Sequence, residues 1–279
     1  MLIAEVFGFG VDDHSTEAWE TRNSKLCPFR GTKCTKSSKT NPIGICSLSD
    51  GKEAAATCPV RFVENDKIFK DAARLAFGEG VAFGIYPEVR ILKIEAKEAG
   101  ERDRKIGKVD FLLGNIDDGK VIDFAAVEVQ AVYFSGGTIR PAMNHYLAHR
   151  KLDVAISDRR PDFRSSAQKR LVPQLQLKIP VFRRWGKKFF VAVDTQFFRA
   201  LPGFRQTTHA NSEITWLTYP IEKQGHGYRF GTVQVVYSEW DEVRNSLREG
   251  NPPEPDEIVE ELQTKLDGPA RKKPKIISI

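Results

Sequence analysis

The chain has no long apolar run and no cysteine after residue 58. None of its apolar stretches approaches the roughly 20 residues that a membrane helix needs. The first residues, MLIAEVFGFGVDDHS, contain neither a basic leader nor a cleavage signature, so we expect no secretion signal. With 41% hydrophobic and 29% charged residues, the composition is that of a globular protein, which we expect to be cytoplasmic.

Acidic residues are absent from Thr21 through Ser49, and this part of the chain begins a segment that is rich in cysteine. The segment contains little apolar material, so it cannot fold by packing alone. Two disulfides are one solution, but clustered thiols in a reducing compartment favour a tetrahedral metal site. The spacing lacks the Cys-x2-Cys pairs of common zinc ribbons. The clustering still predicts one structural metal bound by all four cysteines, Cys27, Cys34, Cys46 and Cys58.

Positive charge is concentrated in one region. The net charge is +6, and residues 138–188 alone contain 13 Lys and Arg against 3 Asp, which gives +10. Such a field suits a polyanion, most commonly nucleic acid, although a solvated basic face is the alternative. The candidate DNA-binding residues are Arg159, Arg160, Arg164, Lys169, Arg170, Arg183 and Arg184.

Two adjacent segments are predicted to be strands that carry carboxylates. RKIGKVDFLLGN (104–115) leads through a turn at 115–119 into VIDFAAVEVQAVYFSGG (121–137). Alternation along a strand places Glu128 and Gln130 on one face, and a hairpin would bring Asp110 beside them. A solvated sheet edge would explain the same pattern. An acid on one strand and Glu-x-Gln on the next is nevertheless typical of nucleases that hold Mg²⁺ against a phosphate.

Other segments complete an α/β outline. Helices are predicted at 66–77 and 139–156, one strand or a pair of strands at 81–95, and a buried strand at 187–198. A proline-rich linker precedes a short helix at 256–266 and a basic tail. We expect a mixed central sheet flanked by helices, with a metal-binding module at 1–64, a nuclease domain at 65–250 and a C-terminal segment at 251–279.

This combination resembles the type II restriction endonucleases of the NotI kind, in the larger group marked by Asp and Glu-x-Lys. The resemblance rests on Asp110, on VEVQ with Gln130 where most relatives have Lys, and on the four-cysteine module. It covers roughly residues 20–200. It implies a restriction-endonuclease-like fold, a single iron on the cysteines, and a prokaryotic homodimer that cuts double-stranded DNA at a GC-rich palindrome to leave 5′ overhangs.

The resemblance also implies roles for individual residues. Asp110 and Glu128 would bind Mg²⁺, which activates a water, and Gln130 would aim that water for in-line attack that expels the 3′ oxygen. Glutamine cannot supply the charge of lysine, so more of the stabilisation falls to the metal. Glu88 and Glu95 are both candidates for an additional acid, and the sequence does not choose between them.

Two other functions fit parts of the pattern. An iron–sulfur exonuclease of recombination or CRISPR adaptation would also combine cysteines with a nuclease core, but its cysteines usually lie on both sides of that core. A non-catalytic DNA-binding protein with a zinc module is the second alternative. Arginines that fork to guanine O6 and N7 fit a GC-rich target, although phosphate contacts use the same side chains.

Overall fold

The computed structural model describes residues 2–95, 104–135, 139–151, 160–248, 253–269 and 274–277. The chain is a mixed α/β protein that divides into two compact units, residues 1–247 and 248–279, and we describe each by itself. Within the described ranges, no helix is both long and apolar enough to cross a membrane.

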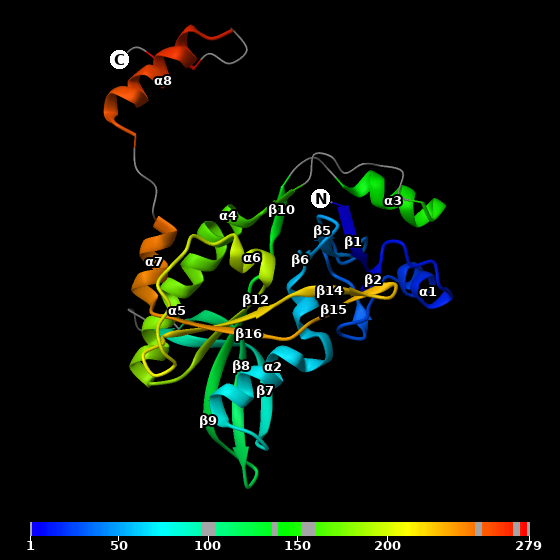
Figure 1. Cartoon of the computed structure of the whole chain (residues 1–279), viewed down its shortest axis with the longest axis vertical. Coiled ribbons are helices and arrows are strands. Elements are labelled where there is room, and N and C mark those ends of the chain that lie inside the picture. Colours follow the sequence, from blue (N-terminus) through cyan, green and yellow to red (C-terminus); the bar gives the residue numbers. More distant parts are fainter. Residues whose placement is uncertain are drawn as a thin grey trace. The chain divides into compact units, whose positions relative to one another are not determined.

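A six-stranded mixed sheet forms the centre of the larger unit (Figure 1). The strands β9, β12 and β13 are parallel, and the other neighbouring pairs are antiparallel. In spatial order, the strands are β16 (Gln234–Ser238), β13 (Ile214–Tyr219), β12 (Phe189–Asp194), β9 (Lys120–Val129), β8 (Arg104–Asp117) and β7 (Ala82–Ile94).

The predicted hairpin is confirmed by the antiparallel pair β8–β9. Its turn is shorter than predicted, because both strands continue to Asp117 and Lys120 and leave only Asp118 and Gly119 between them. Both turn residues have positive φ, 45° and 71°, which suits the tight hairpin turns whose twist matches that of the strands. Residues 115–117, predicted as turn, therefore belong to the strand.

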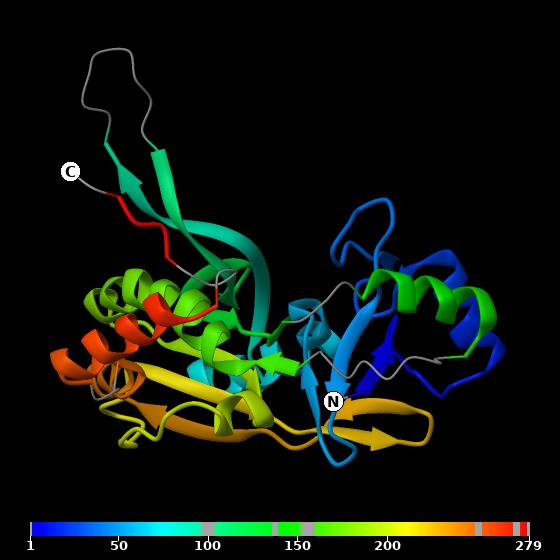
Figure 2. The same cartoon turned by 90° about the horizontal axis from the view of Figure 1, so that it is seen from above.

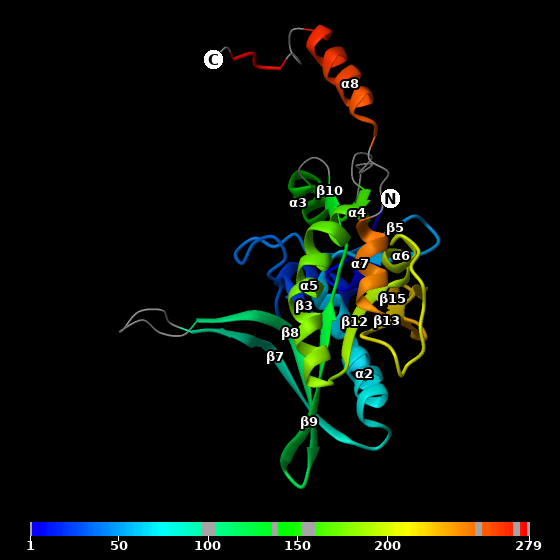
Figure 3. The same ribbon diagram turned by 90° about the vertical axis from the view of Figure 1, so that its left-hand side faces the viewer.

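The strands β7 and β8 leave the sheet together as a two-stranded arm, which projects from the unit in Figures 2 and 3. Their pairing extends from Ala82 opposite Ile116 to Ile94 opposite Arg104. The segment that was predicted as one strand or a pair of strands is thus a single long strand.

Helices cover both faces of the central sheet. On one face, α2 (Lys67–Phe77) packs against alternate residues of β9, including Ala125 and Val127. On the other, α5 (Val172–Trp185) and α7 (Trp240–Arg248) pack against Ala126 and Val191. The helix predicted at 66–77 is confirmed as α2. The period-two alternation of β9 explains why neighbouring residues enter different cores.

A second six-stranded sheet combines the N-terminal strands with a hairpin from late in the chain. Figure 2 shows the N-terminal strands, in blue, and this hairpin, in yellow, lying side by side. Ile221 of the late hairpin pairs with Ala54. In spatial order, the strands are β15 (Gly227–Phe230), β14 (Ile221–Gln224), β6 (Ala54–Ala56), β5 (Ile45–Ser49), β1 (Leu2–Val6) and β2 (Phe9–Gly10).

The remaining elements of the larger unit are short. Two small antiparallel pairs are β3 (Leu26–Cys27) with β4 (Thr32–Lys33) and β10 (Tyr133–Ser135) with β11 (Arg160–Asp162). The remaining helical segments are α1 (Thr16–Ser24), the 3-10 segment η1 (Pro59–Asp66), α3 (Arg140–His149), α4 (Phe163–Ser166), the π turn η2 (Ala167–Leu171) and α6 (Thr195–Arg199).

Three sequence predictions differ in part from the structure. The strand predicted at 187–198 ends at Asp194, because the carboxylate of Asp194 accepts the N–H of Phe197 and caps α6. The helix predicted at 139–156 begins as α3 but ends at His149, because Arg150 has a φ of 58° and caps the helix; residues 152–156 lie outside the described residues. The helix α5 was not predicted from the sequence. It contains two prolines: Pro173 lies at the helix start, where proline is tolerated, and Pro180 lies inside the helix.

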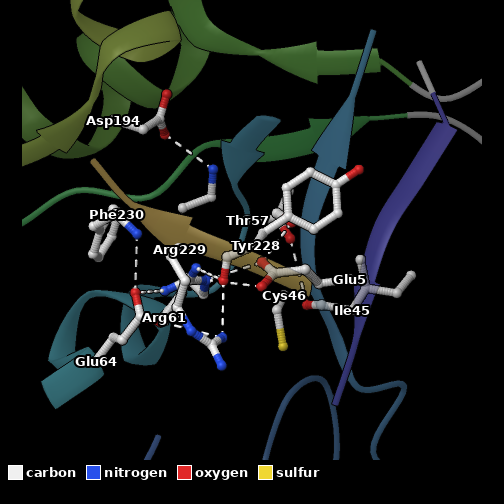
Figure 4. A network of polar contacts seen from close by, with 12 residues as sticks. Glu5, Ile45, Cys46, Thr57, Arg61, Glu64, Asp194, Tyr228, Arg229 and Phe230 are labelled. Carbon is white, nitrogen blue, oxygen red and sulfur yellow. Dashed lines mark hydrogen bonds and ion pairs between the residues drawn. The ribbon is translucent and has the colours of Figure 1, made fainter. Parts of the chain in front are cut away.

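A buried group of charges holds the second sheet together, as Figure 4 shows. We call Glu5, Arg61 and Glu64 the Arg61 cluster. The guanidinium of Arg61 is fully buried; its Nε lies 2.9 and 3.1 Å from the two Glu5 oxygens, and its Nη1 lies 2.7 Å from Glu64 Oε2. Nη2 donates to the Tyr228 carbonyl at 3.0 Å. These contacts join β1, η1 and β15.

Asp194 connects the two sheets. Its Oδ2 accepts the N–H of Ala56 in β6 at 3.0 Å, and its Oδ1 accepts that of Phe197 at 2.8 Å. Complete burial raises the pKa of Asp194 to about 7, while the N–H donors oppose that rise. Nearby, the N–H of Val132 donates to the Ala56 carbonyl at 2.7 Å.

The smaller unit contains α8 (Pro255–Asp267), which confirms the short helix predicted at 256–266. Its apolar residues Ile258, Val259 and Leu262 are all exposed within the described residues.

Candidate functional site

Asp110 and Glu128 face each other across the β8–β9 hairpin. Phe111 pairs with Val127, so Asp110 lies directly opposite Glu128. Each carboxylate accepts a backbone N–H from the other strand: Glu128 Oε1 from Asp110 at 3.1 Å, and Asp110 Oδ2 from Val129 at 3.0 Å. Among the described residues, no hydrogen bond reaches Glu128 Oε2 or Asp110 Oδ1. One oxygen of each carboxylate is therefore left for a ligand.

A cavity of about 990 Å³ opens beside these two carboxylates. One wall comes from β9 and the residues after it, a second from the start of α5, and a third from the cysteine-rich segment. Basic residues line it on several sides. These are Lys36, Arg140, Lys169 and Arg170. A carboxylate pair inside a basic cavity suits a phosphate ester that is bound together with a divalent cation.

Burial and repulsion act together on Glu128, which is 4% exposed. Burial is the larger cause and the charge of Asp110 the second, and together they raise the pKa of Glu128 to about 7. Lys178 acts in the opposite direction. Its Nζ lies 2.7 Å from Glu128 Oε1 and 2.5 Å from Gln174 Oε1. A raised pKa produced by burial and a like charge, in a cavity, is typical of functional carboxylates.

Gln130 lines the same cavity, two residues beyond Glu128. Its Nε2 donates to the carbonyl of Ala131 at 2.5 Å. The amide nitrogen is thereby held, and the amide oxygen is the group that can accept a hydrogen bond from a water.

The structure separates the two candidates for an additional acid. Pro87 pairs with Phe111 and Val89 with Val109, so Glu88 lies opposite Asp110, and both line a smaller cavity of about 480 Å³. Glu88 is exposed, has a φ of 57°, and its carboxylate lies 2.8 Å from Lys108 Nζ. Glu95 follows the end of β7, seven residues farther along the arm, and is exposed.

The predicted DNA-binding residues fall into separate places. Lys169 and Arg170 line the main cavity, where the Arg170 guanidinium lies 4.5 Å from the centre of the Tyr133 ring. Arg183 and Arg184 are exposed in the last turn of α5, and Arg183 pairs with Glu213 at 2.9 Å. Arg164 is exposed in α4. Arg159 and the side chain of Arg160 lie outside the described residues.

The four cysteines are free thiols in one part of the larger unit. Cys27 and Cys34 flank the β3–β4 turn, while Cys46 lies in β5 and Cys58 precedes η1. Cys34 interacts electrostatically with Cys27 and Cys58, and Cys46 with Cys58. Burial raises the pKa of Cys34 and of Cys46. Across the described ranges, no three His, Cys, Asp or Glu residues are grouped closely enough to hold a metal.

Sequence reasoning missed three cations near the carboxylates. Lys178 was counted only as part of the basic stretch, although its place among Leu175, Ile179 and Phe182 on one helix face was a usable signal. Arg140 and Lys36 enter the cavity from α3 and from the cysteine-rich segment. Lys36 donates to the Thr57 carbonyl, and burial lowers the pKa of its ammonium group.

Comparison with known families matches the chain to the model described as restriction endonuclease NotI, over residues 16–232. The matched range is more than half of the chain and contains all four cysteines, both facing carboxylates and Gln130. No curated protein matches the chain. The family expected from the sequence is therefore confirmed: this chain belongs to the NotI family of restriction endonucleases, which are hydrolases that cleave DNA.

Proposed function

We propose that this protein is a type II restriction endonuclease that cleaves double-stranded DNA at a GC-rich palindrome, requires Mg²⁺, and leaves 5′ overhangs. One observation carries the proposal: Asp110 and Glu128 face each other at the basic cavity, each with one carboxylate oxygen free of hydrogen bonds among the described residues. Two carboxylates with the remaining positions open are a donor set that fits Mg²⁺.

The chain's own residues account for the other requirements of phosphodiester hydrolysis. Asp110 and Glu128 would hold Mg²⁺, which when bound supplies positive charge at the phosphate and acidifies a water. The amide oxygen of Gln130 accepts a hydrogen bond from the attacking water and orients it. Lys169 and Arg170 bind the flanking phosphates. Glu88, opposite Asp110, is a better placed additional acid than Glu95.

Recognition of the site falls to the basic residues away from the carboxylates. Arginine reads guanine by forking to O6 and N7, which supports a GC-rich target. A palindrome presents two identical half-sites, and a homodimer matches that symmetry with one active site for each strand.

We further propose that Cys27, Cys34, Cys46 and Cys58 close around one structural metal, iron or zinc. The electrostatic interactions of Cys34 with Cys27 and Cys58, and of Cys46 with Cys58, support this, as does the N–H of Lys36, which donates to Cys34 Sγ at 3.4 Å. The four thiols would have to draw closer together to bind the metal, because no three of them are grouped closely enough among the described residues. Since burial keeps the thiols of Cys34 and Cys46 protonated, metal binding would release protons.

The test is a Mg²⁺-dependent plasmid digest with wild type, Glu128→Gln and the exposed control Glu53→Gln. We expect discrete fragments from wild type and the control, and a loss of at least about a thousandfold from Glu128→Gln with DNA binding retained. Degradation from DNA ends would instead indicate an exonuclease. Binding without cleavage would indicate a non-catalytic DNA-binding protein, and either result would contradict the proposal.

A further inference from the structure

Lys178 is a charged side chain on an apolar helix face. The residues around it on α5, Leu175, Ile179 and Phe182, belong to the core between that helix and the central sheet. Lys178 is only 1% exposed. Burying an ammonium group is costly, and an apolar side chain of similar length would pack at this position without that cost. Packing alone therefore does not explain a lysine here.

The contacts of Lys178 lead to the nuclease strands. Its Nζ lies 2.7 Å from Glu128 Oε1, and Gln174, one helical turn earlier on α5, holds the same nitrogen from the side at 2.5 Å. Oε1 also accepts the N–H of Asp110. All the described contacts of this carboxylate are thus made by Oε1. The amine and the β8 backbone fix the direction of the side chain and leave Oε2 free.

Electrostatics explains why the residue that holds Glu128 is a cation. The two strands carry two facing carboxylates, and Gln130, which lines the same cavity two residues beyond Glu128, is neutral. Helix α5 covers the face of β9 to which Glu128 belongs, because Ala126, two residues earlier, packs in the same core as Leu175 and Ile179. Lys178 therefore reaches the carboxylates from the helix rather than from the strand.

We propose that Lys178 is a positioning residue of the nuclease site, which holds Glu128 in place and supplies positive charge to the carboxylate pair from α5, while Gln130 beside them is neutral. The inference rests on the proposed function, in which Asp110 and Glu128 bind Mg²⁺.

The chain offers a matched control for removing this lysine. Lys223 pairs with Asp12 at 2.7 Å, the same distance as Lys178 to Glu128, but both partners are about half exposed. Lys178→Met removes a positive charge from a buried pair beside the cavity. Lys223→Met removes the same charge from a solvated pair away from the cavity. The double variant Lys178→Met with Gln130→Lys returns a charge to the site from the strand.

Three quantities are measured: the single-turnover cleavage rate with Mg²⁺, Mg²⁺ affinity by calorimetry without DNA, and thermal melting. Lys178→Met should cleave roughly a hundredfold more slowly. It should also bind Mg²⁺ at least about tenfold more tightly, because a unit charge beside Glu128 no longer opposes the cation. Gln130→Lys should recover at least about tenfold of the lost rate, which a lysine with a purely structural role on α5 does not explain. Lys223→Met should match wild type in both its cleavage rate and its Mg²⁺ affinity.

A Lys178→Met variant that folds and cleaves within about threefold of wild type would overturn the inference, as would a double variant no faster than the single one. If Lys178→Met does not fold, Lys178→Gln, which keeps a polar group for Gln174 and Glu128, is measured against the same limits. Wild type and Glu128→Gln are measured in parallel. Mg²⁺-independent cleavage by wild type, or cleavage by Glu128→Gln, refutes the proposed function and this inference with it. If wild type and Glu128→Gln behave as expected but Lys178→Met is fully active, only the inference is refuted.

Discussion

Two buried groups of charges in this protein differ in how completely they are satisfied. In the Arg61 cluster, both oxygens of Glu5 contact the guanidinium, and Ser47 donates a further hydrogen bond at 2.6 Å. Glu64 Oε2 accepts hydrogen bonds from Arg61 and from the N–H of Phe230, and Glu64 Oε1 pairs with Arg229 Nη1 at 3.5 Å. At the Asp110–Glu128 pair, by contrast, each carboxylate has one oxygen without a hydrogen bond among the described residues, and a cavity of about 990 Å³ lies beside it.

The difference distinguishes a group of buried charges that is fully paired from one that has room for a ligand. A buried carboxylate with both oxygens occupied is held in a single position and has no capacity for a ligand. Two carboxylates that face each other and share one buried cation, Lys178, carry a net negative charge. A bound metal cation would neutralise that charge. We therefore expect substitutions in the Arg61 cluster to change stability, and those at the facing carboxylates to change chemistry.

The largest expected effect is on the Arg61 cluster. Arg61→Met should lower the free energy of unfolding by about 3–5 kcal/mol, because two buried carboxylates lose their partner. Urea denaturation measures the loss, and Arg199→Met, which removes an exposed pair with Glu53 at 2.8 Å, should change it by less than about 1 kcal/mol. Folded Arg61→Met protein should cleave DNA at the wild-type rate. Lost cleavage in fully folded protein would contradict the division between the two groups.

A smaller loss is expected in the cysteine-rich segment next to that cluster. Cys46→Ser should lower the free energy of unfolding by roughly 3 kcal/mol, because metal binding and folding are coupled. Elemental analysis should show that its iron or zinc is lost, while Thr35→Ala, a change of an exposed residue beside Cys34, should retain it. Equal metal content in the two variants would refute the four-cysteine site.

The smallest effect is a pH dependence that originates at Glu128. Its pKa is raised from an ordinary value near 4.5 to about 7 in the folded protein. The folded state then holds a proton that the unfolded state has lost, so the stabilisation is complete below about pH 4.5 and disappears as the pH rises through 7. Relative to Glu128→Gln, wild type should lose about 2 kcal/mol of unfolding free energy between pH 5 and 8 in buffer without divalent cations. If the difference in unfolding free energy between wild type and Glu128→Gln is the same at pH 5 and pH 8, the pKa of Glu128 is not raised.

Local patterns predicted the elements that surround the carboxylates. Alternation over Val121–Val129 and the turn before it gave the hairpin, and the hairpin alone placed Asp110 opposite Glu128. Apolar spacing gave α2 and α8 in the same way. These predictions succeeded because each depends on residues that are close in the chain.

Contacts between distant segments were not predictable in this way. Lys178 meets Glu128 across 50 residues, and that contact depends on how α5 packs on the sheet, which no short pattern encodes. Helix α5 itself was not predicted. The position of Glu88 opposite Asp110 depends on the register of β7 against β8, which is set by the whole arm.

The composition of the second sheet has a consequence for synthesis on the ribosome. Strand β6 takes its neighbour β14 from residues 221–224, and Arg61 donates to the carbonyl of Tyr228. The first 64 residues therefore emerge long before the strands and the acceptor that complete their sheet. Until the rest of the chain is translated, β6 has no β14 to pair with, and Arg61 lacks the Tyr228 carbonyl as a hydrogen-bond acceptor. Premature release or truncation before residue 230 would leave that edge open to pairing with other chains.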